Sequence, residues 1–139
     1  MGLFLILSIN MTRKEIGQKA RQYLQDAQIL INGKRYEGAV YLLGYVLELS
    51  LKRAICKCLD WQEYPPEGKW DNYRTFKSHN LVVLLSLSRK EKMVRKTLFT
   101  EWSNVSQWDP GTLRYRSKKF PKNDTIILYR SVLNILKAL

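Results

Sequence analysis

Arg74 and His79, five positions apart, are the side chains whose types and spacing are most suited to chemistry. His79 is the only histidine, and it stands where a loop is expected to enter a helix. Backbone N–H groups at a helix start disfavour a protonated imidazole, so His79 can act as a base. Arg74 can hold a phosphate with two hydrogen bonds. The pair predicts RNA cleavage without a metal: a base deprotonates the 2′-hydroxyl, and a cation stabilises the phosphoryl oxygens.

This reaction needs two positions for proton transfer. One histidine per chain therefore suggests a homodimer that brings two copies of His79 together, or water as the second participant. A purely structural interpretation stays open, in which His79 caps a helix and Arg74 is a solvated loop residue, because an isolated Arg-x4-His pattern is short.

A second group comprises Tyr41, Tyr45, Glu48 and Lys52, spaced by four, three and four residues. On a helix this spacing gives one polar and aromatic stripe, and the rest of the segment is apolar. Glu48 is costly to bury alone, and Lys52 one turn later is its natural partner. The stripe either ties helices or a dimer interface together, or forms one wall of a cleft that contains His79.

A third group combines aromatic and basic residues near the C-terminal end. Stacking of bases on aromatic rings and pairing of phosphates with cations is what single-stranded RNA binding requires. Trp108 equally fits a role as a core residue, because tryptophan is usually well buried. The candidate RNA-binding residues are Trp108, Arg114, Tyr115, Arg116, Lys118 and Lys119.

Helical periodicity and stop signals position these groups. Thr12-Arg-Lys-Glu15 has the form of a capping box, and Asp109-Pro-Gly interrupts a later helix. Gly38 and Gly44 fit close approaches of another backbone. We expect helices over 12–33, 36–59, from Ser78 onward, over 89–107 and over 124–138, with an aromatic-rich connection at 60–77 and a basic one at 112–122.

The second of these segments is apolar on most sides, which is typical of a central helix. The last helix is expected to point Ile127, Leu128, Val132, Ile135 and Leu136 inward. The chain is therefore predicted to be all-α, an antiparallel, up-and-down bundle of four to five helices. We assign residues 12–139 to one domain and residues 1–11 to an apolar N-terminal segment, where Met11 offers an alternative start.

Composition sets the class of partner. A net charge of +12 favours a polyanion such as RNA, DNA or an anionic membrane, or an acidic protein, although a basic surface also serves solubility. The apolar segment is too short to span a membrane and lacks the basic start of a signal peptide. Cys56 and Cys58 do not suit a mutual disulfide, and with one histidine they supply too few zinc ligands. We expect buried free thiols, no cofactor and a cytoplasmic location.

Three stretches resemble the HEPN domains of bacterial and archaeal defence and toxin–antitoxin systems. They are Ala39-Val-Tyr-Leu-Leu-Gly-Tyr-Val-Leu-Glu-Leu-Ser-Leu-Lys52, Lys77-Ser-His-Asn-Leu81, and Trp108 followed by Leu113-Arg-Tyr115. With the helix order, the resemblance covers most of residues 12–139.

The resemblance implies a helical bundle that dimerises and, in catalytic members, a metal-independent endoribonuclease with an Arg-x4–6-His motif at the dimer cleft. Arg74 and His79 match that motif, with His79 as general base or acid and Arg74 as the phosphate contact. Glu48 and Lys52 match a Glu-x3-Lys feature of some branches. A nucleotidyltransferase-like antitoxin is the partner that the resemblance suggests. The alternative is a non-catalytic HEPN module that binds nucleotide, RNA or a protein.

Overall fold

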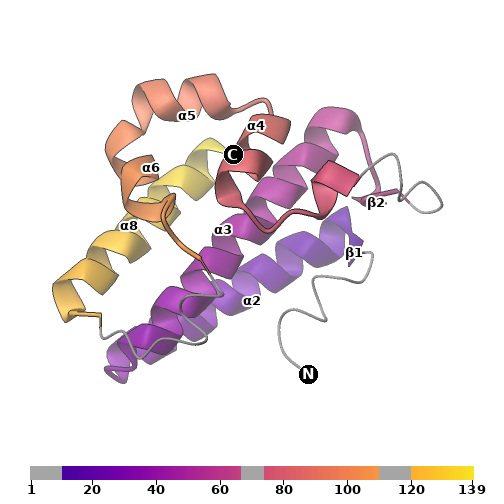
Figure 1. Ribbon diagram of the computed structural model, residues 1–139. Coiled ribbons are helices and arrows are strands. Elements are labelled where there is room, and N and C mark those ends of the chain that lie inside the picture. Colours follow the sequence, from indigo (N-terminus) through magenta and orange to yellow (C-terminus); the bar gives the residue numbers. More distant parts are fainter. Residues whose placement is uncertain (1–10, 67–73, 110–119) are drawn as a thin grey trace.

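The structure is a bundle of α-helices, given by a computed structural model that describes residues 11–66, 74–109 and 120–139. Residues 1–10 and the connection expected at 112–122 lie wholly or mostly outside the described residues. The all-α prediction is confirmed (Figure 1). The elements are β1 (Met11–Thr12), α2 (Arg13–Asn32), α3 (Tyr36–Leu59), β2 (Glu63–Tyr64), η1 (Arg74–Lys77), α4 (Leu81–Leu87), α5 (Glu91–Thr97), α6 (Phe99–Val105) and α8 (Lys122–Ala138).

Helix α2 begins at the capping box that the sequence predicts. The backbone N–H of Glu15 donates to Thr12 Oγ1 at 3.1 Å, and that of Thr12 donates to Glu15 Oε1 at 3.0 Å. Together they satisfy two N–H groups that have no partner within the helix. The backbone hydrogen bond from Thr12 also lowers the pKa of the Glu15 carboxyl. Gly33 ends the helix, as expected.

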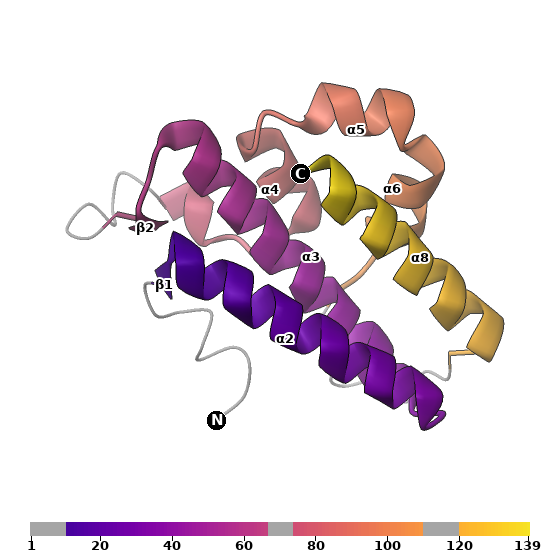
Figure 2. The ribbon, with the colours of Figure 1, turned by 180° about the vertical axis from the view of Figure 1, so that it is seen from behind.

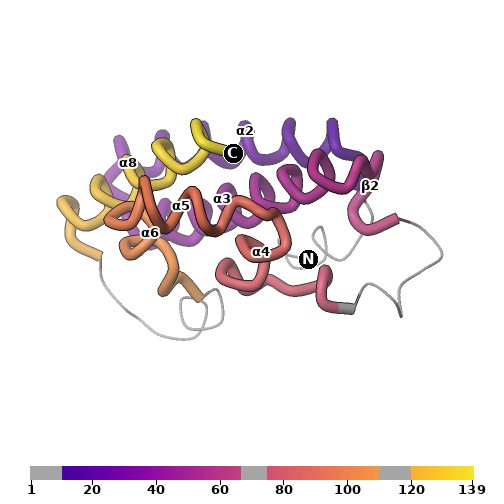
Figure 3. The backbone as a smooth tube through the Cα atoms, turned by 90° about the horizontal axis from the view of Figure 1, so that it is seen from above, coloured from indigo at the N-terminus to yellow at the C-terminus, as the bar shows by residue number. Residues whose placement is uncertain are grey.

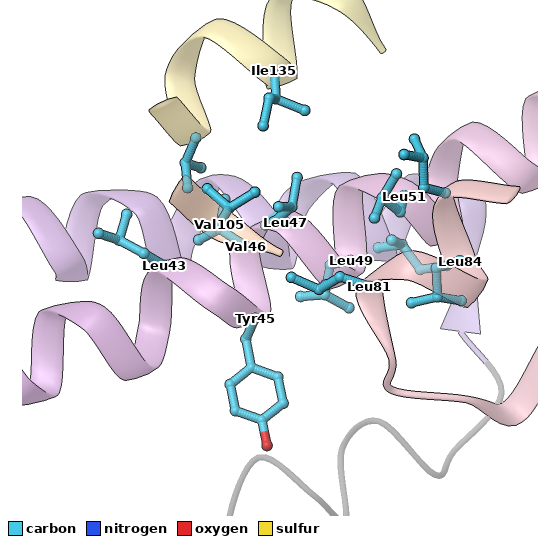
Figure 4. Packing of buried hydrophobic residues seen from close by; sticks show 14 of the residues in the cluster. Leu43, Tyr45, Val46, Leu47, Leu49, Leu51, Leu81, Leu84, Val105 and Ile135 are labelled. Carbon is cyan, nitrogen blue, oxygen red and sulfur yellow. The ribbon is translucent and has the colours of Figure 1, made fainter. Parts of the chain in front are cut away.

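Helix α3 is the centre of the bundle. It packs against α2, α4 and α8, and its buried side chains extend from Ala39 to Cys56. Figures 1 and 2 show α2 and α8 running along α3, and Figure 4 shows Ile135 of α8 on the side of α3 away from Tyr45. Because other elements surround α3, its apolar residues need not be confined to one face. The prediction of a central helix is confirmed.

Two short strands join the start of α2 to the segment after α3. β1 and β2 pair antiparallel, with Met11 opposite Tyr64 and Thr12 opposite Glu63. The backbone N–H of Arg13 extends the pairing by donating to Gln62 O at 2.8 Å. The sequence gave no sign of this pairing, since two residues are too few to show alternation. It fixes Tyr64 beside the N-terminal end of α2.

Two predicted helix boundaries were wrong. The third helix was expected to start with Ser78 as its cap, but α4 begins at Leu81, and Asn80 Oδ1 accepts from the N–H groups of Val82 and Val83 at 2.9 and 3.2 Å. Asparagine is the stronger cap, which moves the start by two residues. The helix expected over 89–107 divides into α5 and α6 at Leu98, whose backbone is not helical.

The inward face of α8 is confirmed for Val132 and Ile135 and wrong for Ile127. Val132 and Ile135 are buried, whereas Ile127 is 49% exposed. Thr125 and Ser131 are buried instead, and each hydroxyl bonds a main-chain oxygen one turn earlier. At 100° per residue, Ile127 lies on the far side of the helix from Val132.

The two cysteines are free, as expected, but only Cys56 is buried and Cys58 is exposed. Burial raises the pKa of the Cys56 thiol to about 11. Across the described parts of the chain, the helices all fall short of the length and apolarity that a membrane crossing requires.

Candidate functional site

His79 lies in the three-residue link between η1 and α4. On its C-terminal side Asn80 caps α4, and on its N-terminal side the hydroxyl of Ser78 accepts a hydrogen bond from Asn80 N at 3.0 Å. Both contacts fix the backbone on either side of the imidazole. His79 itself therefore precedes the cap, and the alternative in which His79 caps the helix is wrong.

The imidazole points at a buried carboxylate. Nδ1 of His79 lies 3.1 Å from Oε2 of Glu48, which is fully buried in the middle of α3. An ionised carboxylate has no proton to donate, so the shared proton belongs to Nδ1. In the neutral ring this leaves the lone pair on Nε2. The side chain of His79 remains 31% exposed, so solvent or a substrate can reach the ring.

Lys52 supplies the opposite charge. Its Nζ donates to the same Oε2 of Glu48 at 3.2 Å, and both side chains are almost completely shielded from water. A buried carboxylate is tolerated only with such a partner, because the desolvation of an isolated charge is very costly. With a neutral His79 the three groups carry no net charge.

Tyr64 closes the other side of Lys52. Lys52 Nζ lies 5.4 Å from the centre of the Tyr64 ring, within the range of a cation–π interaction. The Tyr64 hydroxyl donates to the main-chain oxygen of Phe76 at 2.5 Å. Burial, followed by the nearby Cys56 and Glu48, raises the pKa of Tyr64, so the phenol stays protonated and keeps donating.

An aromatic cluster holds η1 in place. The ring of Phe76 lies 4.9 Å from that of Trp61 and 6.3 Å from that of Tyr64, measured between centroids. Edge-to-face contacts of this kind add stability beyond the buried area. Since η1 starts at Arg74 and ends two residues before His79, the cluster positions the backbone of the whole Arg-x4-His segment. The side chain of Arg74 is outside what the structure describes.

The upper part of the stripe is aromatic and packs on Trp108. The Tyr45 ring meets Tyr41 at 5.2 Å and Trp108 at 5.0 Å, both edge to face. A Cβ placed on Gly44 would lie 1.7 Å from the Trp108 ring, so Gly44 allows this contact as the sequence predicted. Gly38 faces only the side chain of Leu30, at 3.3 Å. Trp108 thus occupies the packing position that the second interpretation of this residue describes.

Two buried polar atoms beside this stripe lack hydrogen-bond partners in the described part of the chain. They are Glu48 Oε1, an acceptor, and Trp108 Nε1, a donor. Glu48 lies one helical turn after Gly44, the residue on which the indole of Trp108 packs. Buried polar atoms are rarely left unsatisfied in folded proteins, so a water or a ligand at this position would be stabilised.

The structure thus brings Glu48, Lys52 and His79 into one hydrogen-bonded cluster, which we call the Glu48 cluster, and joins Tyr41 and Tyr45 to Trp108. Sequence reasoning missed Tyr64 and Phe76, since the aromatic content of residues 60–77 was the sole signal. Of the residues that the structure describes, no three His, Cys, Asp or Glu side chains converge as metal ligands would. The predicted RNA-binding residues outside the described ranges are Arg114, Tyr115, Arg116, Lys118 and Lys119.

Comparisons of the chain with models of protein families, with curated proteins and with solved structures gave no match.

Proposed function

We propose that the chain is a metal-independent endoribonuclease of the HEPN type, acting as a homodimer in a toxin or defence role. The observation that carries the proposal is the hydrogen bond from His79 Nδ1 to the buried Glu48, because it orients a solvent-accessible imidazole. A base held by a third group is the arrangement that proton-transfer catalysts share. The net charge of +12 and the resemblance of three stretches to HEPN domains give the substrate class.

The reaction begins at Nε2 of His79. This nitrogen takes the proton of a ribose 2′-hydroxyl, and the 2′-oxygen attacks the adjacent phosphorus. The bond from phosphorus to the 5′-oxygen breaks, which leaves a 2′,3′-cyclic phosphate on one fragment and a 5′-hydroxyl on the other after that oxygen receives a proton. As the imidazole becomes charged, the carboxylate of Glu48 stabilises it at 3.1 Å.

Two further requirements go beyond one protomer's Glu48 cluster. The leaving oxygen needs an acid, which a second copy of His79 across a dimer cleft would supply, with water as the alternative. The phosphoryl oxygens need a cation, and Arg74 is the candidate on the segment that carries His79. A nucleotidyltransferase-like antitoxin would restrain such an activity by covering the cleft.

A second candidate is a non-catalytic module that binds RNA, nucleotide or a protein. It is favoured by the pairing of Glu48 with Lys52, because a buried ion pair can serve packing specificity alone. In that case His79 would complete the hydrogen bonding of Glu48 without transferring a proton.

The test is incubation of purified protein with RNA in excess EDTA, with analysis of the fragment ends. The proposal predicts 2′,3′-cyclic phosphate and 5′-hydroxyl ends from the wild type, and loss of cleavage in Arg74→Ala and His79→Ala with RNA still bound. Salt-sensitive RNA binding without cleavage by the wild type would favour the module. Cleavage that survives both substitutions would refute the assignment of the site.

A further inference from the structure

Two adjoining cavities lie between α2, α3, the turn after α4 and the C-terminal end of α8. One has a volume of about 150 Å³ and includes Gly17, Arg21 and Arg53 in its lining. The other, of about 350 Å³, includes Arg89 and Lys90. Both are lined by Ala54, Lys57 and Leu139, so they meet at Lys57. We call the two together the basic pocket.

The cationic groups of the basic pocket crowd one another. Nε of Arg53 and Nη1 of Arg21 lie 3.1 and 3.6 Å from the position that a Cβ on Gly17 would take. Arg53 and Lys57 are also one turn apart on α3, an arrangement in which like charges repel. Glycine at position 17 leaves the space in which the two guanidinium groups converge. The pocket is thus built to gather positive charge.

No acid compensates this charge within the described residues. Neither cavity has Asp or Glu in its lining, and the ion pairs of the described side chains involve none of these cations. The recorded oxygen contact is between Lys57 Nζ and the main-chain oxygen of Leu139, at 3.4 Å. Burial, then Arg53, Lys90 and Arg13, lower the pKa of Lys57, which reflects the cost of this unbalanced charge. An anion would remove that cost.

The basic pocket and the Glu48 cluster are on opposite sides of α3. At 100° per residue, Arg53, Ala54 and Lys57 point roughly opposite to Glu48 and Lys52. Figure 3 shows the same division, with α2 and α8 along one side of α3 and α4 with η1 along the other. The basic pocket is therefore a second site, and its assignment does not depend on the proposed RNA cleavage.

The lining also indicates which part of a ligand fits. Guanidinium and ammonium groups bind phosphate oxygens through charge-assisted hydrogen bonds. The apolar lining residues are aliphatic, among them Leu24 and Leu136, and in the described part of the chain no aromatic ring lines either cavity. Nothing there can stack a base, so recognition would not depend on sequence.

We propose that the basic pocket binds closely spaced phosphate groups, with Arg21, Arg53 and Lys57 holding one phosphate and Lys57, Arg89 and Lys90 the next. Two sources share this chemistry: the backbone of an RNA strand and a free polyphosphate. The volumes of the two cavities and their junction at Lys57 suit two neighbouring phosphates.

The test compares two variants of the full-length protein that lose the same charge. Arg53→Gln with Lys57→Gln removes the centre of the pocket, and Lys92→Gln with Lys96→Gln removes two exposed cations from α5. Because Arg53 and Lys57 repel each other, the pocket variant should fold at least as well as the wild type, which circular dichroism and the Tm check. Binding of inorganic pyrophosphate is measured by calorimetry, and binding of single-stranded RNA over a range of salt concentrations.

The proposal predicts that pyrophosphate binds the wild type and the α5 variant equally, and the pocket variant about tenfold more weakly or less for each cation removed. If RNA is the source, pyrophosphate displaces it, and the slope of log K against log salt falls by about 0.7 per lost phosphate contact in the pocket variant alone. Pyrophosphate binding with unchanged RNA binding identifies a free polyphosphate. The proposal is overturned if pyrophosphate does not bind and the two variants bind RNA alike.

Discussion

His79 Nδ1 and Glu48 Oε2 are 31 positions apart in sequence and 3.1 Å apart in space. The carboxylate comes from the buried middle of α3, and the imidazole comes from the link that precedes α4. Glu48 shares the same oxygen with Lys52. This relationship turns an isolated Arg-x4-His pattern into an oriented proton-transfer group, and each role in it can be tested by itself.

The Glu48 to Lys52 pair should contribute to stability mainly by neutralising a buried charge. Lys52→Met leaves the carboxylate uncompensated and should lower the free energy of unfolding by about 3–5 kcal/mol. Glu48→Leu combined with Lys52→Met should recover much of that loss, because no buried charge remains. Urea denaturation measures both. If the double variant is the less stable of the two, the pair contributes more than mutual neutralisation.

Glu48→Gln tests the orientation of the imidazole. A glutamine side chain can donate to Nδ1, which would place the ring proton on Nε2 and remove the base. RNA cleavage per folded molecule should fall by about 10²–10⁴, the usual contribution of general acid–base catalysis, with little change in RNA binding. Lys52→Met is the matched control, since it keeps the carboxylate beside His79. Equal rates for Glu48→Gln and the wild type would contradict the role of Glu48.

Gly44 should tolerate no side chain. Gly44→Ala places a Cβ 1.7 Å from the Trp108 ring and should lower the free energy of unfolding by about 1–3 kcal/mol, through the displacement of a packed aromatic group. Gly38→Ala on the same helix is the control. Its nearest neighbour is a flexible leucine at 3.3 Å, and alanine gains helix propensity of about 1 kcal/mol. Thermal unfolding of both variants separates the two effects, and similar losses would argue against the Trp108 contact.

The two thiols should differ in reactivity. Cys58 is exposed, whereas burial raises the pKa of Cys56 to about 11. In the native protein at pH 8, a disulfide reagent should modify one thiol, and in Cys58→Ser none. Since the pKa of Cys56 is higher in the folded chain than its ordinary value of 9.0, ionisation favours unfolding, and stability should fall as the pH rises from 9 towards 11. Rapid modification of native Cys58→Ser would show that Cys56 is accessible.

Local signals predicted most of the fold. The capping box at Thr12 and the glycine stop at Gly33 fix α2, and the nearly unbroken apolar run predicts α3 as the central helix. The boundaries that failed depend on competition between neighbours. Ser78 and Asn80 can both cap a helix, and the stronger cap determines the start of α4. The break at Leu98 has no glycine or proline to announce it.

The site could be predicted only along single helices. The stripe from Tyr41 to Lys52 follows from spacing, and so does the pairing of Glu48 with Lys52. The contact of Glu48 with His79 and that of Lys52 with Tyr64 depend on how distant segments pack, which periodicity does not encode. Tyr64 is positioned by a two-residue strand pairing that leaves no pattern in the sequence.

The tautomer of His79 tests the central claim most directly. The chain has one histidine, so nitrogen NMR of protein labelled with ¹⁵N-histidine reports this ring alone. At pH 8 the account predicts a proton on Nδ1 and an unprotonated Nε2 in the wild type, with the proton moved to Nε2 in Glu48→Gln. A wild-type ring that carries its proton on Nε2 at that pH would contradict the account, because Glu48 would then not hold His79 as the base.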